Sequence, residues 1–506
     1  MAQEVYGFVS PKCLAITATS LMSILPSATP NMGDVTQVVE VQISPCPPRI
    51  LPIISVESQI LQIMKVLSRF SPQTISSEMI KKGNYQWWIR MDKKYMCSLL
   101  LVAVFFGSLA LAFKIYRVEA QLQTVYIRAN GDVEPSWALI QRSGNVYTFT
   151  GDLMVDGDAT GIIIERDNMT LDGAGYRLSR SPHVAHAYGI NLTGRSNVTI
   201  QNIEVTTFWD GIVLWNSHNN TIQGNNVTAN SGFGIALWNF SDYNTISGNN
   251  VAANSADGIG LDLSSYNSIH NNTVTGHYQD GIVLDAYSDH NQIMRNKVVN
   301  NGFGIELYDS ANNTMSQNNI TENANHGVML YYSSRNNVSK NVATDNDLEG
   351  ILLSFSHFNL VEGNHLANNE DGLTVGWGSH NNTIYTNTII SNEFGIQVID
   401  ASNNTFCHND LVNNTNQVAS SNSINKWDCG YPSGGNIWSD YEERYPNATE
   451  IDDSGIWDTP YVIDENNRDN YPIIPEFPSA AIFPLFMIAT LLTTMFYRRK
   501  RLLKTK

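Results

Sequence analysis

Glycine recurs about every 23 residues through the middle of this chain, and this period constrains the fold more than any other feature. The residue after each glycine is Ile, Leu or Val, and the third residue after it is Leu or Val. That alternation is typical of a short strand with one buried face, and its regular recurrence indicates stacked repeats. The nine glycines are Gly211, Gly234, Gly258, Gly281, Gly304, Gly327, Gly350, Gly372 and Gly395.

Three columns of asparagine run through the same repeats, starting at Asn220, Asn225 and Asn230, and only His277 interrupts them. Asparagine tolerates the left-handed backbone of a tight corner, and its amide can bond to the asparagine one turn above or below. Each repeat therefore reads as three short strands separated by asparagine corners. Because 23 residues leave no room for a helix, we predict an all-β, right-handed parallel β-helix rather than a leucine-rich horseshoe. Roughly eleven turns at about 4.8 Å each give a length of about 50 Å.

The repeats divide the 506-residue chain into regions. We predict a β-helix over residues 161–415, an N-terminal cap over 121–160 and a C-terminal cap over 416–474. The cap covers a last turn whose open sheet edge would otherwise favour aggregation. Residues 1–90 show no usable periodicity and receive no function, and they fit an over-extended start that precedes Met91.

Two apolar segments predict the location of the protein. Leu99–Phe113 follows two lysines and precedes small residues, so residues 91–120 read as a secretion signal or a signal anchor. Ala480–Tyr497 is almost uncharged and is followed at once by a basic tail, so residues 475–506 read as an anchor with a transmembrane helix. We therefore predict a protein of the cell membrane that faces outward, with a cytoplasmic C-terminus. Sequons such as Asn447-Ala448-Thr449 suit a glycosylated exterior.

Charge and cysteine content limit the partners. The net charge of −17, with few basic residues between 200 and 420, excludes a nucleic-acid partner because nothing there could neutralise phosphates. Of five cysteines, Cys407 and Cys429 fall within the folded body. They could form one disulfide that pins the last turn to the cap, or remain two free thiols.

The repeats resemble a known family. The pattern in Asp210–Val227, Asp-Gly-Ile-x-Leu followed by Asn-Asn-Thr-Ile-x-x-Asn-x-Val, is similar to NosD-like β-helix repeats, which are related to carbohydrate-binding proteins and sugar hydrolases. Gly434–Tyr441 and Asp458–Asp464 resemble the closing segment of archaeal members. Pro475–Pro478 and the tail after it resemble archaeal surface-sorting tails. The resemblance implies a β-helix fold, and it implies little about function because such repeats are scaffold.

One face of the predicted β-helix gathers aromatic and acidic residues. Alternation along the first strand of each repeat points the second and fourth residues after the glycine outward, so that they stack into columns. Aromatic rings stack on sugar rings, and carboxylates bond to hydroxyl groups. The pattern therefore predicts a surface that binds extracellular polysaccharide or glycoprotein. Its candidate binding residues are Trp215, Trp238, Asp262, Asp285, Glu306, Tyr308 and Tyr331.

The same face allows an enzyme as an alternative. Asp262 and Asp285 fall in adjacent turns, about 4.8 Å apart, where two carboxylates either share a proton or bind a cation such as calcium. A polysaccharide hydrolase of the polygalacturonase type would use three close acids and a histidine, and Asp257, Asp280, Asp285 and His326 could supply them. A lyase or epimerase is the other enzymatic class considered, although no basic residue lies close by in the sequence. No cofactor other than calcium is expected.

Further alternatives follow from other features. The outward aromatics could simply cover the strand face of a structural stalk or adhesin, which would be expected if residues 423–471 lay over Trp215 and Trp238. The NosD resemblance also raises copper handling, which would favour clustered histidine, methionine or cysteine. The histidines are dispersed instead, with His218, His357 and His380 at corners.

Overall fold

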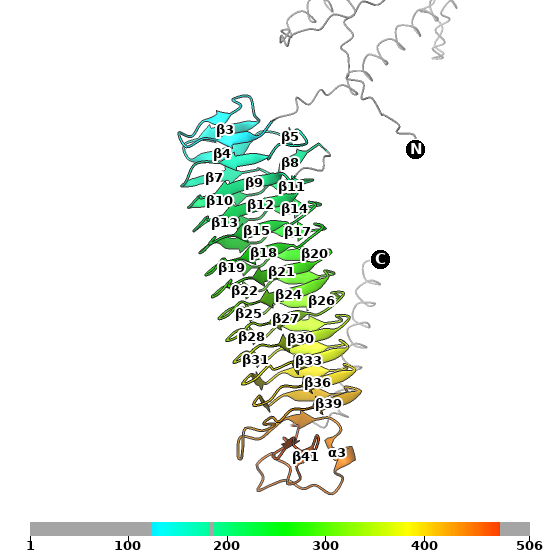
Figure 1. Cartoon of the computed structure of the whole chain (residues 1–506). Helices are drawn as coiled ribbons and strands as arrows, with labels where there is room; N and C mark the ends of the chain where they lie inside the picture. The colour runs from blue at the N-terminus through cyan, green and yellow to red at the C-terminus, as the bar shows by residue number, and fades with distance from the viewer. Residues whose placement is uncertain (1–122, 182–185, 476–506) are drawn as a thin grey trace, which may run out of the picture. The chain divides into compact units, whose positions relative to one another are not determined.

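A stack of parallel β-strands forms the body of the protein. The computed structural model describes residues 123–181 and 186–475. They form a parallel β-solenoid of about 13 turns, nearly all of which contribute one strand to each of three sheets (Figure 1). The expected all-β parallel β-helix is confirmed, and the expected number of about eleven turns is too low. Residues 125–155, expected in the N-terminal cap, already supply strands to all three sheets.

Each sheet takes one strand from nearly every turn, and the first two sheets each carry one additional antiparallel strand at the N-terminal end. The first sheet contains β1 (Val125–Ile127), β2 (Val133–Glu134), β6 (Ile162–Ile164), β9 (Tyr188–Thr193), β12 (Asp210–Trp215), β15 (Ile235–Trp238), β18 (Ile259–Asp262), β21 (Asp280–Asp285), β24 (Phe303–Tyr308), β27 (Val328–Tyr331), β30 (Glu349–Ser354), β33 (Asp371–Gly376), β36 (Phe394–Ile399) and β39 (Asn416–Ser421). The second contains β3 (Ile140–Ser143), β4 (Val146–Phe149), β7 (Met169–Asp172), β10 (Val198–Gln201), β13 (Thr221–Gln223), β16 (Thr245–Ser247), β19 (Ser268–His270), β22 (Gln292–Met294), β25 (Thr314–Ser316), β28 (Asn337–Ser339), β31 (Leu360–Glu362), β34 (Thr383–Tyr385) and β37 (Thr405–Cys407). The third contains β5 (Leu153–Val155), β8 (Arg177–Arg180), β11 (Glu204–Thr206), β14 (Asn226–Thr228), β17 (Asn250–Ala252), β20 (Thr273–Thr275), β23 (Lys297–Val299), β26 (Asn319–Thr321), β29 (Val342–Thr344), β32 (His365–Ala367), β35 (Thr388–Ile390), β38 (Asp410–Val412) and β40 (Ile437–Trp438).

The glycine period arises from close packing between turns. A Cβ atom at Gly281 would lie 2.4 Å from a methyl group of Val298 and 2.7 Å from the carbonyl oxygen of Gly304 in the next turn. Only glycine allows this approach of one backbone to the next. The apolar residues that follow, such as Ile282 and Leu284, are fully buried in the core.

The asparagine columns are ladders buried inside the solenoid. The backbone N–H of Asn272 donates to Oδ1 of Asn296 at 3.0 Å, and its side-chain amide donates to the carbonyl of Ile246 at 2.9 Å. The left-handed residue is the one before it, Asn271, at φ 56°. The sequence predicted that one asparagine would both form the ladder and adopt the left-handed corner. In the structure these two roles belong to neighbouring residues.

An aromatic cluster closes the C-terminal end. Trp427 stacks on Phe406 of the last complete turn at 4.2 Å between ring centroids, and Trp438 stacks on Tyr461 at 4.0 Å. These contacts place the segment after β39 against the end of the stack (Figure 1). Its remaining elements are α3 (Tyr441–Arg444), β41 (Tyr461–Val462) and β42 (Arg468–Asp469).

Within residues 123–181 and 186–475, no helix is long and apolar enough to cross a membrane. Residues 1–90, the expected signal segment Leu99–Phe113 and the expected transmembrane segment Ala480–Tyr497 lie outside the described residues.

Candidate functional site

A cavity of about 240 Å³ opens on the outward face of the first sheet, across β15, β18, β21 and β24. We call it the acidic cavity. It brings together five of the seven candidate binding residues and three of the four candidate catalytic residues. Trp215, Tyr331 and His326 do not line it. The lining residues are Phe233, Trp238, Asp257, Gly260, Leu261, Asp262, Asp280, Val283, Asp285, Glu306 and Tyr308.

Gly260 makes room for the ring of Phe233 in the lining of the acidic cavity. Gly260 stands two residues after the repeat glycine, where neighbouring turns carry Ala236 and Val283. A Cβ atom at Gly260 would lie 2.5 Å from the ring of Phe233, so the ring takes space that a side chain would otherwise fill. Phe233 in turn meets Trp238 edge to face at 5.7 Å between ring centroids.

Asp280 and Glu306 are paired side chain to side chain in the lining of the acidic cavity. Asp280 is 9% exposed, and its side chain is hydrogen-bonded to that of Glu306. Burial, followed by the charge of Glu306, raises the pKa of Asp280 to about 9, and burial also raises the pKa of Glu306. At neutral pH, Asp280 therefore keeps its proton.

Two further acids complete the acidic cluster. Oδ1 of Asp257 accepts the backbone N–H of Asp280 at 2.7 Å, and burial raises the pKa of Asp257 to about 6. Asp262 pairs in register with Asp285 on the next strand. Burial, followed by the charge of Asp285, raises the pKa of Asp262. The buried acids are therefore harder to ionise than ordinary surface carboxyls.

The calcium site considered at Asp262 and Asp285 contains two carboxylates in register. In the part of the chain that the structure describes, three His, Cys, Asp or Glu ligand atoms within 4.8 Å of one another occur only at Cys407, His408 and Cys429. The acid pair therefore lacks a third such ligand in place, whereas calcium usually takes six to eight oxygens.

His326 lies one turn beyond the acidic cavity. Its Nδ1 atom forms an ion pair with Glu349, and its ring lies 5.4 Å from that of Phe303. Its charge partly offsets the rise in the pKa of Glu306. The structure thus gathers the three predicted acids in one cavity, while Glu306, which the sequence suggested only for binding, is the direct partner of Asp280.

The aromatic side of the face is open. Trp215 meets Trp238 edge to face at 5.9 Å, and 43% of its surface is exposed. The segment 423–471 packs on the last turn instead of covering these rings, which removes the observation that would have favoured a plain stalk.

A second cavity, of about 320 Å³, adjoins the first and shares Tyr308 with it. We call it the aromatic cavity. Tyr332 and Phe355 stack there, at 4.9 Å between centroids and an interplanar angle of 13°. Sequence reasoning missed both, because they lie one residue beyond the column followed there. The sequence did carry a signal for them: at this repeat position Tyr332 and Phe355 replace the asparagines of the first repeats, Asn216 and Asn239. The remaining lining residues are Asp309, Ser334 and His357.

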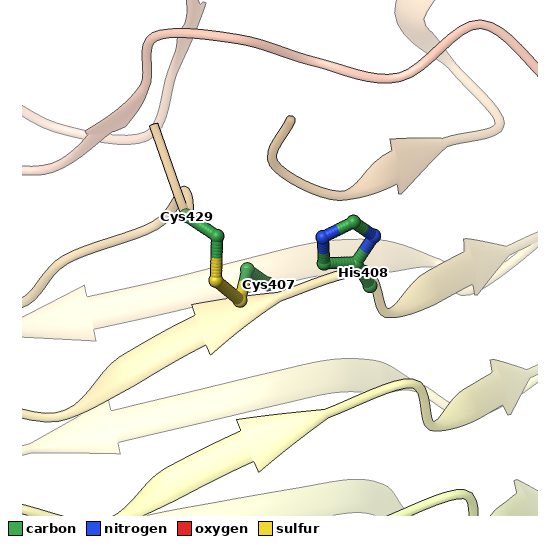
Figure 2. Close-up of side chains that lie close together, drawn as sticks. All are labelled: Cys407, His408 and Cys429. Atoms are coloured by element: carbon green, nitrogen blue, oxygen red, sulfur yellow. A yellow bond between two sulfur atoms is a disulfide. The ribbon is translucent and has the colours of Figure 1, made fainter. Parts of the chain in front are cut away.

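Cysteine and histidine meet at the C-terminal end. Cys407 and Cys429 form a disulfide, and Figure 2 shows His408 beside it. Since each sulfur is bonded to the other, neither is the free thiolate that binds soft metals. Among the corner histidines, His357 uses Nδ1 to accept the backbone N–H of His380 at 3.1 Å.

Two family models match this chain. The right-handed β-helix region model matches residues 188–343, and the model described as periplasmic copper-binding protein (NosD) matches residues 300–443. With the solenoid fold, these matches support a NosD-like β-helix repeat protein. No curated protein sequence matches the chain.

Solved β-helix structures are similar at low identity. The mannuronan C-5 epimerase AlgE4 A-module of Azotobacter vinelandii is 16% identical, with 56% of this chain and 89% of that chain covered and a TM-score of 0.42. The periplasmic alginate epimerase AlgG is 16% identical, with 60% and 82% covered and a TM-score of 0.42. The Dettilon tailspike protein is 18% identical, with 58% and 63% covered and a TM-score of 0.43. Values this low say nothing about what this chain binds.

Proposed function

We propose that the acidic cavity is a polysaccharide-binding site on an extracellular β-helix protein. The observation that carries this proposal is the combination, within one open cavity, of the rings of Trp238 and Tyr308 with the carboxyl groups of Asp280 and Asp285. Rings supply flat apolar surface for a sugar face, and carboxyl groups bond to its hydroxyls. A glycoprotein glycan presents the same chemistry and is included as a ligand.

A second candidate function is polysaccharide hydrolysis, which the Asp280–Glu306 pair specifically favours. A carboxyl group that keeps its proton at neutral pH can protonate a glycosidic oxygen as the carbon–oxygen bond breaks. A neighbouring carboxylate, such as Glu306 or Asp257, can take a proton from the water that forms the new bond. Both groups face one cavity, as such a reaction requires.

Sequence segments outside the described residues support the proposed location. The signal-like segment and the apolar C-terminal segment with its basic tail favour export and attachment to the membrane, with the solenoid outside and the C-terminus in the cytoplasm. Protease added to intact cells should then cleave the solenoid. Protection of the solenoid until the cells are lysed would contradict this location.

The test of function is a polysaccharide and glycoprotein array with the full-length chain, read with calcium and with a chelator. Each ligand that binds is then assayed for reducing ends and for unsaturated products. We expect binding that falls at least tenfold in the Trp238→Ala variant. Binding without product supports a lectin-like protein, and new reducing ends that disappear in Asp280→Asn support a hydrolase. Failure to bind any glycan would overturn the proposal.

A further inference from the structure

We infer that the ligand is a long, uncharged polysaccharide chain that crosses Tyr308 and occupies both the acidic cavity and the aromatic cavity. This inference rests on the proposed function and adds to it the charge class of the ligand, its length and a second subsite. The aromatic cavity, the exposure of its two stacked rings and the distribution of charge over the face support it independently.

The two cavities form one continuous aromatic path. Tyr308 lines both. Its ring lies 5.5 Å from that of Tyr331, which lies 4.5 Å from Tyr332 and 5.9 Å from Phe355. Because these residues belong to successive turns, the path runs along the stack, and a chain lying on it would meet a new ring about every 4.8 Å.

Tyr332 and Phe355 hold a backbone conformation that disfavours their side chains. Their φ angles are 51° and 49°, in the left-handed region, where a bulky residue is uncommon. Every repeat is left-handed at this position, whichever residue it carries: Asn216 has φ 49°, Leu263 has φ 48° and Ala286 has φ 43°. The two rings nevertheless stay 48% and 38% exposed, so they gain little from burial in the core. The exposed rings instead offer flat apolar surface on which a sugar can stack.

The charge on the path disfavours a strongly anionic ligand. In the described residues, neither cavity is lined by a lysine or an arginine. The lining carries Asp257, Asp262, Asp285 and Glu306 in the acidic cavity and Asp309 in the aromatic one. A polyuronate would bring its own carboxylates against these acids without a cation to pair them. Uncharged sugars offer hydroxyl groups that the same carboxylates can accept from.

The first experiment measures affinity by ligand charge. The full-length chain is titrated at pH 7 with galactan, mannan and xylan, and with polygalacturonate and polymannuronate of matched length, in chelator and in calcium. We expect at least one uncharged polymer to bind at least tenfold more tightly than either polyuronate. Equal or tighter binding of a polyuronate, in either condition, overturns the charge class while leaving polysaccharide binding intact. If no polymer binds, the proposed function itself fails.

The second experiment tests the aromatic cavity with a Tyr332→Asn, Phe355→Asn double variant. We expect its affinity for a long polymer to fall at least tenfold, while affinity for a short oligosaccharide that fills only the acidic cavity stays within twofold. Its melting temperature should stay unchanged or rise, because asparagine suits the left-handed backbone. The Phe355→Tyr variant keeps the ring and should keep the long-chain affinity. Unchanged long-chain affinity in the double variant, or an equal loss for short and long ligands, overturns the second subsite.

Discussion

At the scale of single residues, Asp280 in the acidic cavity holds a proton that an ordinary carboxyl would release. An acid whose pKa is higher in the folded than in the unfolded chain binds its proton more tightly when folded. Its contribution to the free energy of unfolding is therefore most favourable below the pKa of the unfolded chain, 3.8. That contribution is lost as pH rises through the pKa of the folded chain, which for Asp280 is about 9. Stability near this site should fall with rising pH between those limits.

Asp280→Asn should relieve this effect, because the amide is similar in shape and carries no charge. We expect the variant to lose less stability than the native chain between pH 5 and pH 8.5. At pH 8.5 its melting temperature should be higher by about 2–4 °C for each kcal/mol relieved. Thermal unfolding followed by circular dichroism at the two pH values measures this. An equal pH dependence in both chains would mean that Asp280 does not hold its proton.

Asn272→Ala should destabilise the solenoid. In the native chain the backbone N–H of Asn249 donates to Oδ1 of Asn272 at 3.0 Å, and the amide of Asn272 donates to the carbonyl of Ile246. The substitution leaves both backbone groups without a hydrogen-bond partner. Each stranded buried group costs about 1–3 kcal/mol. The matched control is Asn271→Gly, which keeps the left-handed corner next door and should change little. Denaturant unfolding of the two variants makes the comparison, and similar losses would show that the ladder contributes nothing special.

Individual site residues could be predicted only where the repeat fixed their direction. Alternation after the repeat glycine placed Asp262 and Asp285 on the outward face. Asp257 and Asp280 precede the glycine, and they were grouped with that pair because they belong to the same two turns. The sequence could not pair Asp280 with Glu306, since that bond joins different columns of adjacent turns. His326 was grouped with the acids by sequence proximity, whereas its closest acidic partner is Glu349.

At the scale of the element, the backbones of successive turns pack closely against each other at the repeat glycines. Gly281→Ala should therefore disturb the stack, because the added Cβ would collide with backbone in the next turn. We expect a loss of about 1–3 kcal/mol, the usual cost of overpacking. Gly260→Ala is the control, since its Cβ meets mainly the ring of Phe233, which can rotate away. Chemical denaturation should show the larger loss for Gly281→Ala, and the reverse order would contradict the close-packing account.

Strands were predictable from the sequence because glycine, apolar and asparagine columns repeat in every turn. The first turns were not, because residues 125–155 lack those columns. They join the sheets through β1, β4 and β5 nonetheless, and β1 and β4 each also pair with an antiparallel neighbour. A strand can pair through its backbone with the edge of a sheet without carrying the glycine and asparagine columns of the regular repeat.

At the scale of the whole molecule, the disulfide ties the C-terminal cap to the stack. Cys407 and Cys429 are 22 residues apart, and closing a loop of that size is worth about 3 kcal/mol in the chain-entropy account. Cys407→Ser with Cys429→Ser should lower the free energy of unfolding by about that amount. The reduced native chain is the control and should behave like the double variant. If reduction changes nothing, the two cysteines are not bonded in the protein.

The central claim is that the acidic cavity receives a sugar chain, and filling the cavity tests it most directly. Gly260→Val adds an isopropyl group beside Phe233 without changing any charge, and its neighbour in the column, Val283, shows that valine suits the strand. Thr245→Val, on an outward position of β16 in the second sheet, is the matched control. Calorimetric titration of a polysaccharide that binds the native chain should show at least a tenfold loss for Gly260→Val and none for Thr245→Val. Full affinity in Gly260→Val would place the ligand elsewhere and contradict the account.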